Sequence, residues 1–241
     1  MIGYQCRRLL IWQDRNWKRV ILVIVSATAL IADCVCLICD YFTSDRLSWS
    51  LPIFQLTFYH KSSLISHVEY PELFHSTGND ISYSRILSDL ERRYSNATEP
   101  LCICGLSLGS LLALDFTIRH GNKVASLVLI GAQYKVPTLL IDFQNLLFHC
   151  MPGKCFDNMG LSKSDAIKLS HSMRSLDFTS QLNRITCPVA ILCGEKDSAN
   201  LKASKKLNEL LPQSTLHIIP GAGHEVNYRK ALTKRQLRRI I

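Results

Sequence analysis

The stretch that most constrains this chain is Gly-Leu-Ser-Leu-Gly at residues 105–109. The apolar run at residues 101–104 predicts a buried strand before it, and residues 110–116 predict a helix after it. A serine between two glycines at such a junction sits on a sharp turn, where larger neighbours would collide with the strand and the helix. The pattern therefore predicts that Ser107 is held at the carboxyl edge of a sheet.

A serine hydroxyl is a weak nucleophile at neutral pH unless a histidine takes its proton and an acid orients that histidine. Downstream, residues 188–193 predict another buried strand, and Asp197 lies on the loop after it. A last short strand is predicted at residues 215–219, followed by a loop that carries His224. Serine, aspartate and histidine thus occur in this order, each on the loop that follows a predicted strand.

This arrangement resembles the α/β-hydrolase family, whose catalytic triad follows the same chain order. The resemblance implies that Ser107 is the nucleophile, that His224 acts as general base and then as general acid, and that Asp197 orients the imidazole. It covers roughly residues 67–232. It implies no cofactor, and the sequence contains neither a dinucleotide-binding glycine motif nor a phosphate-binding loop.

The resemblance also implies an oxyanion hole made of two backbone amides. The amide of Leu108, directly after the nucleophile, is expected to supply the first. The second is expected from the turn after an early strand, for which residues 20–25 are the candidate and Ala27 or Thr28 the donor.

Alternatives to the acid and the histidine remain open at this stage. A loop aspartate is often only solvated, and a surface histidine is common. The other acids considered are Glu195, Asp142 and Asp157, and the other histidines are His120, His149, His171 and His217.

The predicted fold is α/β, with a mostly parallel central sheet flanked by helices and a helical lid insertion. A chain of 241 residues with 47% hydrophobic content is large enough for one such domain. We expect the hydrolase core at residues 67–134 and 186–241, with the lid at residues 135–185. Within the core, a helix is expected at residues 201–211 and a terminal helix from residue 226. Residues 1–66 form an atypical N-terminal region.

The predicted lid has two helical stretches. Residues 136–151 are strongly apolar, and Ser162 has the pattern of a helix N-cap. Most apolar side chains there must pack the lid onto the core. We expect Phe143 and Phe148 to be the ones that face an apolar substrate pocket.

The N-terminal region departs from the family pattern, because no glycine occurs between Gly3 and Gly78. A fold that turns sharply after each strand needs such residues. One interpretation is an intact hydrolase with an unusual oxyanion turn. A second is membrane attachment through residues 20–39, where only Asp33 is charged.

The third interpretation, which the sequence favours most, is that residues 1–65 derive from a shifted or fused reading frame. All the tryptophans of the chain fall in this region, which marks a break in composition. They are Trp12, Trp17 and Trp49.

Charge and cysteine content exclude some function classes. The net charge of +9 comes largely from basic clusters near the two ends, without interleaved aromatic residues, so nucleic-acid binding is not expected. Several of the 10 cysteines fall within predicted buried strands, where cysteine behaves as a small hydrophobic residue. The cysteines at residues 34–39 have no second cysteine or histidine pair at the spacing that a zinc site requires. We expect reduced thiols, no metal and a cytoplasmic protein, with a membrane anchor at residues 20–39 as the alternative.

The sequence thus predicts a serine hydrolase that cleaves an ester, thioester or related small acyl substrate with an apolar portion. A carbon–carbon bond hydrolase with the same triad, a vestigial family member and a membrane-anchored binding protein are the alternatives. Oligomeric state and substrate identity stay open.

Overall fold

The computed structural model describes residues 56–60, 68–69, 71, 73–74, 81–94, 96–156 and 161–224. The strands are β1 (Leu56–His60), β2 (Val68–Glu69), β3 (Leu101–Leu106), β4 (Val124–Ile130), β5 (Val189–Gly194) and β6 (Ser214–Ile219). The α-helices are α3 (Tyr83–Tyr94), α4 (Leu108–Arg119), α5 (Thr138–Cys150), α6 (Lys163–Ser172) and α7 (Ser198–Leu210). Short 3-10 helices are η1 (Gly121–Lys123), η2 (Gly153–Cys155) and η4 (Thr179–Arg184).

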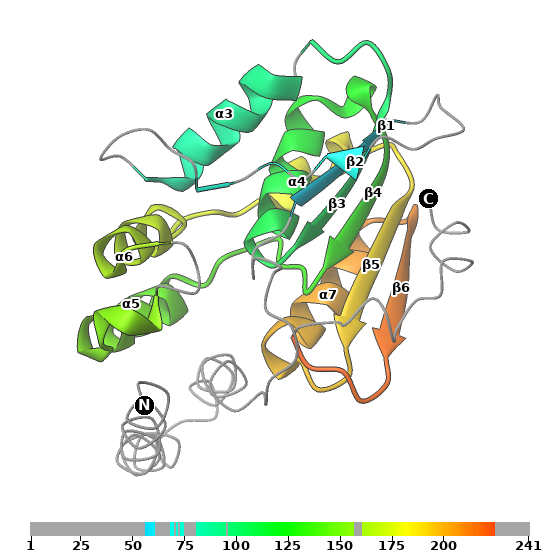
Figure 1. The fold of residues 1–241 in the computed structure, drawn as a ribbon. Coiled ribbons are helices and arrows are strands. Elements are labelled where there is room, and N and C mark those ends of the chain that lie inside the picture. The colour runs from blue at the N-terminus through cyan, green and yellow to red at the C-terminus, as the bar shows by residue number, and fades with distance from the viewer. Residues whose placement is uncertain are drawn as a thin grey trace, which may run out of the picture. The chain divides into compact units, whose positions relative to one another are not determined.

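The strands form one sheet in the order β2-β1-β3-β4-β5-β6 (Figure 1). The neighbours β3, β4, β5 and β6 run parallel, as the sequence predicts. Strand β1 pairs antiparallel with both β2 and β3, with Phe58 opposite Ile103. The sheet is therefore mostly parallel, with an antiparallel edge.

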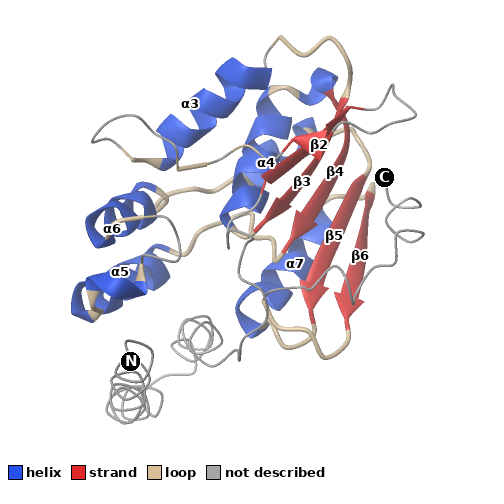
Figure 2. Ribbon diagram, in the orientation of Figure 1, coloured by secondary structure: helices blue, strands red, loops and turns tan. Residues whose placement is uncertain are grey.

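Alternate residues of the central strands face opposite sides of the sheet, and both sets are buried. One face carries Leu127, Leu129 and Ile191, which join a large cluster with the buried side chains of helices α3, α4 and α7. The other face carries Val128 and Ile130 in a smaller cluster with β5. Burial on both faces explains why these strands read as continuous apolar runs. Figure 2 shows α4 and α7 beside the strands they pack against.

The predicted strands at residues 101–104, 188–193 and 215–219 are confirmed as β3, β5 and β6. The helix predicted to start at residue 201 begins earlier, at Ser198, because the Asp197 side chain accepts a hydrogen bond from the Asn200 amide and caps it. Residues 68–74 are expected to hold the tail of a strand and the loop after it, and the strand part is the two-residue β2.

Helices α5 and α6 lie within the predicted insertion and pack against each other. The chain enters and leaves this segment side by side, because Val136 N donates to Leu176 O (2.8 Å) and Phe178 N donates to Tyr134 O (2.9 Å). At the same base, Lys135 pairs with Asp177 (2.7 Å). That this segment acts as a lid stays a prediction.

The predicted strand at residues 20–25, the oxyanion donor Ala27, the hydrophobic segment at residues 20–39 and the terminal helix from residue 226 lie outside the described residues. Among the helices in the described ranges, none has the length and apolar character needed to cross a membrane.

Candidate active site

Ser107 sits at the apex of the turn between β3 and α4, with φ 55° and ψ −116°. It is the only residue other than glycine with a positive φ among the described residues. Such backbone geometry costs on the order of 1–3 kcal/mol and marks functional sites when the surroundings enforce it. The turn is tight because β3 and α4 approach closely: a Cβ on Gly105 would lie 2.2 Å from the carbonyl oxygen of Gly109. This glycine is therefore required by contact, as the sequence predicts.

The carboxyl ends of the parallel strands are joined by hydrogen bonds that extend the ladders into the loops. Ser107 N donates to Ile130 O (3.0 Å), and Gly131 N donates to Leu192 O (2.9 Å). Glu195 N then donates to Ile219 O (3.0 Å). The loops after β3, β4, β5 and β6 are thus held at one edge of the sheet.

Asp197 begins α7 and is buried, with 2% of its side chain exposed. Its Oδ1 accepts a hydrogen bond from the backbone N–H of Asn200 (3.2 Å) as the helix cap. Its Oδ2 lies 2.9 Å from Nδ1 of His224, whose side chain is 12% exposed. An ionised carboxylate only accepts, so the ring donates through Nδ1–H and leaves Nε2 free to take a proton.

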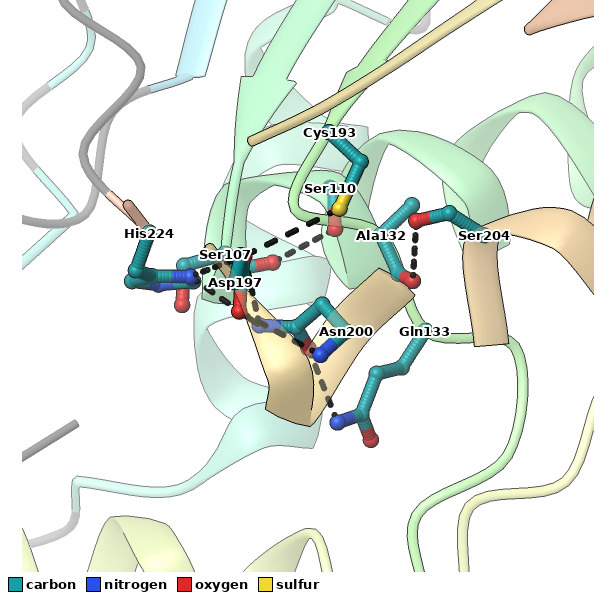
Figure 3. A network of polar contacts seen from close by, with 9 residues as sticks. All are labelled: Ser107, Ser110, Ala132, Gln133, Cys193, Asp197, Asn200, Ser204 and His224. Carbon is teal, nitrogen blue, oxygen red and sulfur yellow. Dashed lines mark hydrogen bonds and ion pairs between the residues drawn. The ribbon is translucent and has the colours of Figure 1, made fainter. Parts of the chain in front are cut away.

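Gly131 lies beneath this pair. Its φ is +56°, and a Cβ there would be 3.0 Å from Cε1 and 3.1 Å from Nδ1 of His224. The preceding residue, Ile130, accepts the Ser107 amide. Ser107, His224 and Asp197 therefore gather around the end of β4, as Figure 3 shows.

The Ser107 hydroxyl is half-buried and has no hydrogen-bond partner among the described residues. Contacts between nucleophile and base are often loose without a substrate and tighten when one binds. Leu108 is the first residue of α4, so its N–H belongs to the first turn and has no partner within the helix. This places the first predicted oxyanion donor directly beside the nucleophile.

The competing acids within the described residues have other partners. Glu195 accepts the backbone N–H of Gly221 (2.8 Å), and Asp142 forms a bidentate pair with Arg174 (2.7 and 2.8 Å). Asp157 lies outside the described residues.

The competing histidines are also placed elsewhere. His120 lies 3.1 Å from Glu91, and His149 contacts the carbonyl of Asn145 in its own helix. His171 belongs to α6 and His217 to β6. His224 is thus the histidine that meets an acid at the end of β4.

Two polar residues that the sequence analysis did not single out complete the network (Figure 3). Asn200 Nδ2 lies 2.9 Å from Oδ1 and 3.1 Å from Oδ2 of Asp197. Gln133 Nε2 donates to Asn200 Oδ1 (2.9 Å). The available signal was the spacing: an asparagine three residues after a helix N-cap lies next to the capping side chain.

Cys193, on β5, is a further neighbour of the acid. Its Sγ lies 4.0 Å from Asp197 Oδ2. Burial, together with the Asp197 charge, raises the pKa of the Cys193 thiol to about 11. The thiol is therefore protonated at neutral pH and acts as a weak donor to the carboxylate.

The two phenylalanines predicted to line a pocket differ in their surroundings. Phe148 packs edge-on against the buried Phe156, with ring centroids 5.2 Å apart. Phe143 is half-buried on α5. The contact of Phe148 is a packing role, and the substrate role of both residues stays a prediction.

Within the described residues no cluster of three or more histidines, cysteines or acids could hold a metal ion. The described cysteines are all free thiols. The cysteines at residues 34–39 lie outside this part of the chain.

Known proteins resemble this chain in sequence. Residues 79–181 match the family model described as serine aminopeptidase, S33. A Bacillus subtilis protein with the provisional name 2-succinyl-6-hydroxy-2,4-cyclohexadiene-1-carboxylate synthase is 24% identical over 229 residues, covering 77% of this chain and 82% of that protein.

Solved structures resemble the fold. An esterase from Exiguobacterium antarcticum matches with a TM-score of 0.60 and 17% identity, covering 73% of this chain and 80% of that one. An α/β-hydrolase enzyme from a Medee basin deep-sea metagenome library matches with a TM-score of 0.59 and 18% identity, covering 70% of this chain and 76% of that one.

The described part of the chain therefore has the α/β-hydrolase fold. The matched family model spans the nucleophile turn, helix α4 and both helices of the insertion.

Proposed function

We propose that this protein is a serine hydrolase that cleaves an ester, thioester or related small acyl substrate with an apolar portion. The observation that carries the proposal is the strained turn of Ser107 beside a buried Asp197–His224 pair. The strained backbone of this serine at a strand–helix junction does not stabilise the fold. Instead, it presents the serine hydroxyl next to a base.

The mechanism follows from the positions of the three side chains. Ser107 Oγ attacks the carbonyl carbon while Nε2 of His224 takes its proton. Asp197 keeps the ring oriented through the 2.9 Å contact at Nδ1 and stabilises the imidazolium that forms. The carbonyl oxygen becomes negative and is stabilised by the Leu108 amide.

Collapse of this intermediate expels the alcohol or thiol, which receives the proton from Nε2. Water then attacks the acyl group on Ser107 with His224 again acting as base, and the acid is released. The second oxyanion donor is proposed to be the Ala27 amide, and the α5–α6 segment is proposed to close over the site as a lid.

The test is labelling of the full chain with a fluorophosphonate, which requires both a nucleophilic serine and a working base. Mass spectrometry locates the adduct, with Ser107→Ala as the control. We expect an adduct on Ser107 that the control lacks. A folded protein without any adduct would show that the triad is vestigial and would overturn the proposal.

Protein that has not been treated with the fluorophosphonate is then supplied with p-nitrophenyl esters, acyl thioesters and a 1,3-diketone. Release of alcohol or thiol supports acyl transfer. Cleavage of the diketone alone would assign the carbon–carbon bond reaction instead.

A further inference from the structure

Asn200 makes more contacts to the Asp197–His224 pair than a helix cap requires. Its backbone N–H already binds Asp197 Oδ1 at 3.2 Å. Its side-chain Nδ2 also donates to both carboxylate oxygens, at 2.9 and 3.1 Å (Figure 3). Nδ2 lies 3.0 Å from Nδ1 of His224, where both groups are donors to the same carboxylate and do not bond to each other. Asn200 is itself buried, with 4% exposed, so bulk solvent has little access to these positions.

The orientation of the Asn200 amide is dictated by its neighbours. The Asp197 carboxylate only accepts hydrogen bonds, so the NH₂ group must face it and the Oδ1 atom must face away. Oδ1 then lies 2.9 Å from Gln133, whose Nε2 donates to it. Gln133 follows Ala132 on the loop after β4, so the Asn200 amide links that loop to the first turn of α7.

Without the Asn200 side chain, the two carboxylate oxygens of Asp197 would have hydrogen-bond partners of different kinds. Oδ1 has the backbone N–H of the helix, whereas Oδ2 has the His224 ring and the weak Cys193 thiol. Because the Asn200 NH₂ group reaches both oxygens, it fixes the rotation of the carboxylate about its own axis. That rotation determines whether Oδ2 points at Nδ1 of the ring.

We propose that Asn200, anchored by Gln133, is a positioning residue that aligns the Asp197 carboxylate with His224. The inference rests on the proposed function, since alignment matters only if His224 acts as a base. Gln133 thus anchors Asn200, Asn200 holds the Asp197 carboxylate, and Asp197 orients the His224 ring.

The test compares variants in the full-length protein. Asn200→Leu has a similar shape and no donor, whereas Asn200→Ser restores one donor, one bond nearer the backbone than the amide nitrogen. Gln133→Leu removes only the anchor. Ser204→Ala is the matched control, because Ser204 is a fully buried polar residue of the same helix whose hydroxyl binds Ala132 O (3.3 Å) rather than the acid.

Two readouts separate positioning from general stability. The first is the rate of fluorophosphonate labelling at Ser107, in samples whose circular dichroism and thermal unfolding match a folded chain. Misplacement of a catalytic group by about 1 Å costs on the order of a hundredfold. We therefore expect Asn200→Leu to label about tenfold to a hundredfold more slowly, Gln133→Leu to fall between it and wild type, and Asn200→Ser to recover part of the rate.

The second readout is the proton NMR signal of His224 Nδ1–H in protein labelled with ¹⁵N-histidine. We expect this downfield signal in wild type and in Ser204→Ala, and its loss or broadening in Asn200→Leu. Equal labelling rates and an unchanged signal in Asn200→Leu would overturn the inference. A wild-type protein that is not labelled at all would refute the proposed function instead, while the NMR signal still reports on the alignment.

Discussion

Gly131 offers a way to move His224 without altering any member of the proposed triad. Its φ of +56° lies in the left-handed region, and a Cβ there would be 3.0 and 3.1 Å from the His224 ring. These contacts are shorter than a normal van der Waals approach, so Gly131→Ala must push the ring outward by a few tenths of an ångström.

Gly221→Ala is the matched control. Gly221 has φ +69°, in the same left-handed region, but a Cβ there meets nothing within 4 Å. The two variants therefore share the backbone cost of an alanine at positive φ, about 1–2 kcal/mol. For a chain of this size each kcal/mol lowers Tm by about 2–4 °C, so both should unfold roughly 2–8 °C below wild type.

Only Gly131→Ala should also lose reactivity. Because a displacement of about 1 Å costs on the order of a hundredfold, a shift of a few tenths of an ångström should slow labelling of Ser107 by about fivefold to tenfold. The assay is the rate of fluorophosphonate labelling at a temperature at which both variants are folded. If Gly131→Ala labels as fast as Gly221→Ala, the placement of His224 against β4 is wrong.

Three further predictions use other parts of the structure. Asp197→Asn keeps a good helix cap but lacks the charge that stabilises the imidazolium, so labelling should fall about 10³–10⁴-fold with Tm nearly unchanged; a large loss of Tm would show that the acid serves the fold instead. Iodoacetamide at pH 8, followed by peptide mapping, should modify the exposed Cys150 and spare the native Cys193, whose pKa is raised to about 11; early modification of Cys193 would contradict its burial. The hydrogen bond from Lys135 lowers the pKa of Asp177 to about 2, below its unfolded value of about 3.9, so the pair stabilises the fold above about pH 4 and loses that contribution as the pH falls towards 2. Urea unfolding should therefore show a small deficit for Asp177→Asn, about 0–1 kcal/mol, at pH 7 and a smaller one at pH 2, where about half of the Asp177 carboxyl groups are protonated; a deficit that does not shrink between pH 7 and pH 2 would rule out this pair as its source.

The placement of Ser107, Asp197 and His224 was predictable because parallel strands end at one edge of a sheet. Each of these residues follows a continuous apolar run, and the runs became β3, β5 and β6. Local pattern therefore determined which loops meet. The contact between the acid and the histidine required no information beyond the order of the strands.

The supporting residues could not be found in the same way. Asn200 was overlooked because the helix was predicted to start at residue 201, after the turn in which its side chain meets the cap. Gln133 comes from a different loop, and nothing in its own sequence neighbourhood indicates a partner on α7. Polar pairs between loops depend on the tertiary fold, which periodicity does not report.

The antiparallel pairing of β1 with β2 and β3 was likewise not predictable from the sequence. Strand β1 (Leu56–His60) is five residues long and pairs with β3 (Leu101–Leu106) across the forty residues between them. A short strand of this kind has no length signal to separate it from a loop, and its direction is determined only by its partner.

Asp197 couples the integrity of the candidate site to the N-terminal end of helix α7. Its Oδ1 and its backbone carbonyl both accept the Asn200 N–H at 3.2 Å, so this amide proton is protected only while the first turn of α7 is closed. Helix ends fray faster than whole domains unfold. Each fraying event would release the carboxylate from its place beside His224 and then restore it. Hydrogen exchange at the Asn200 amide would therefore report these openings, and the fraction of time the turn is closed would set an upper limit on how much of the folded population is ready to react.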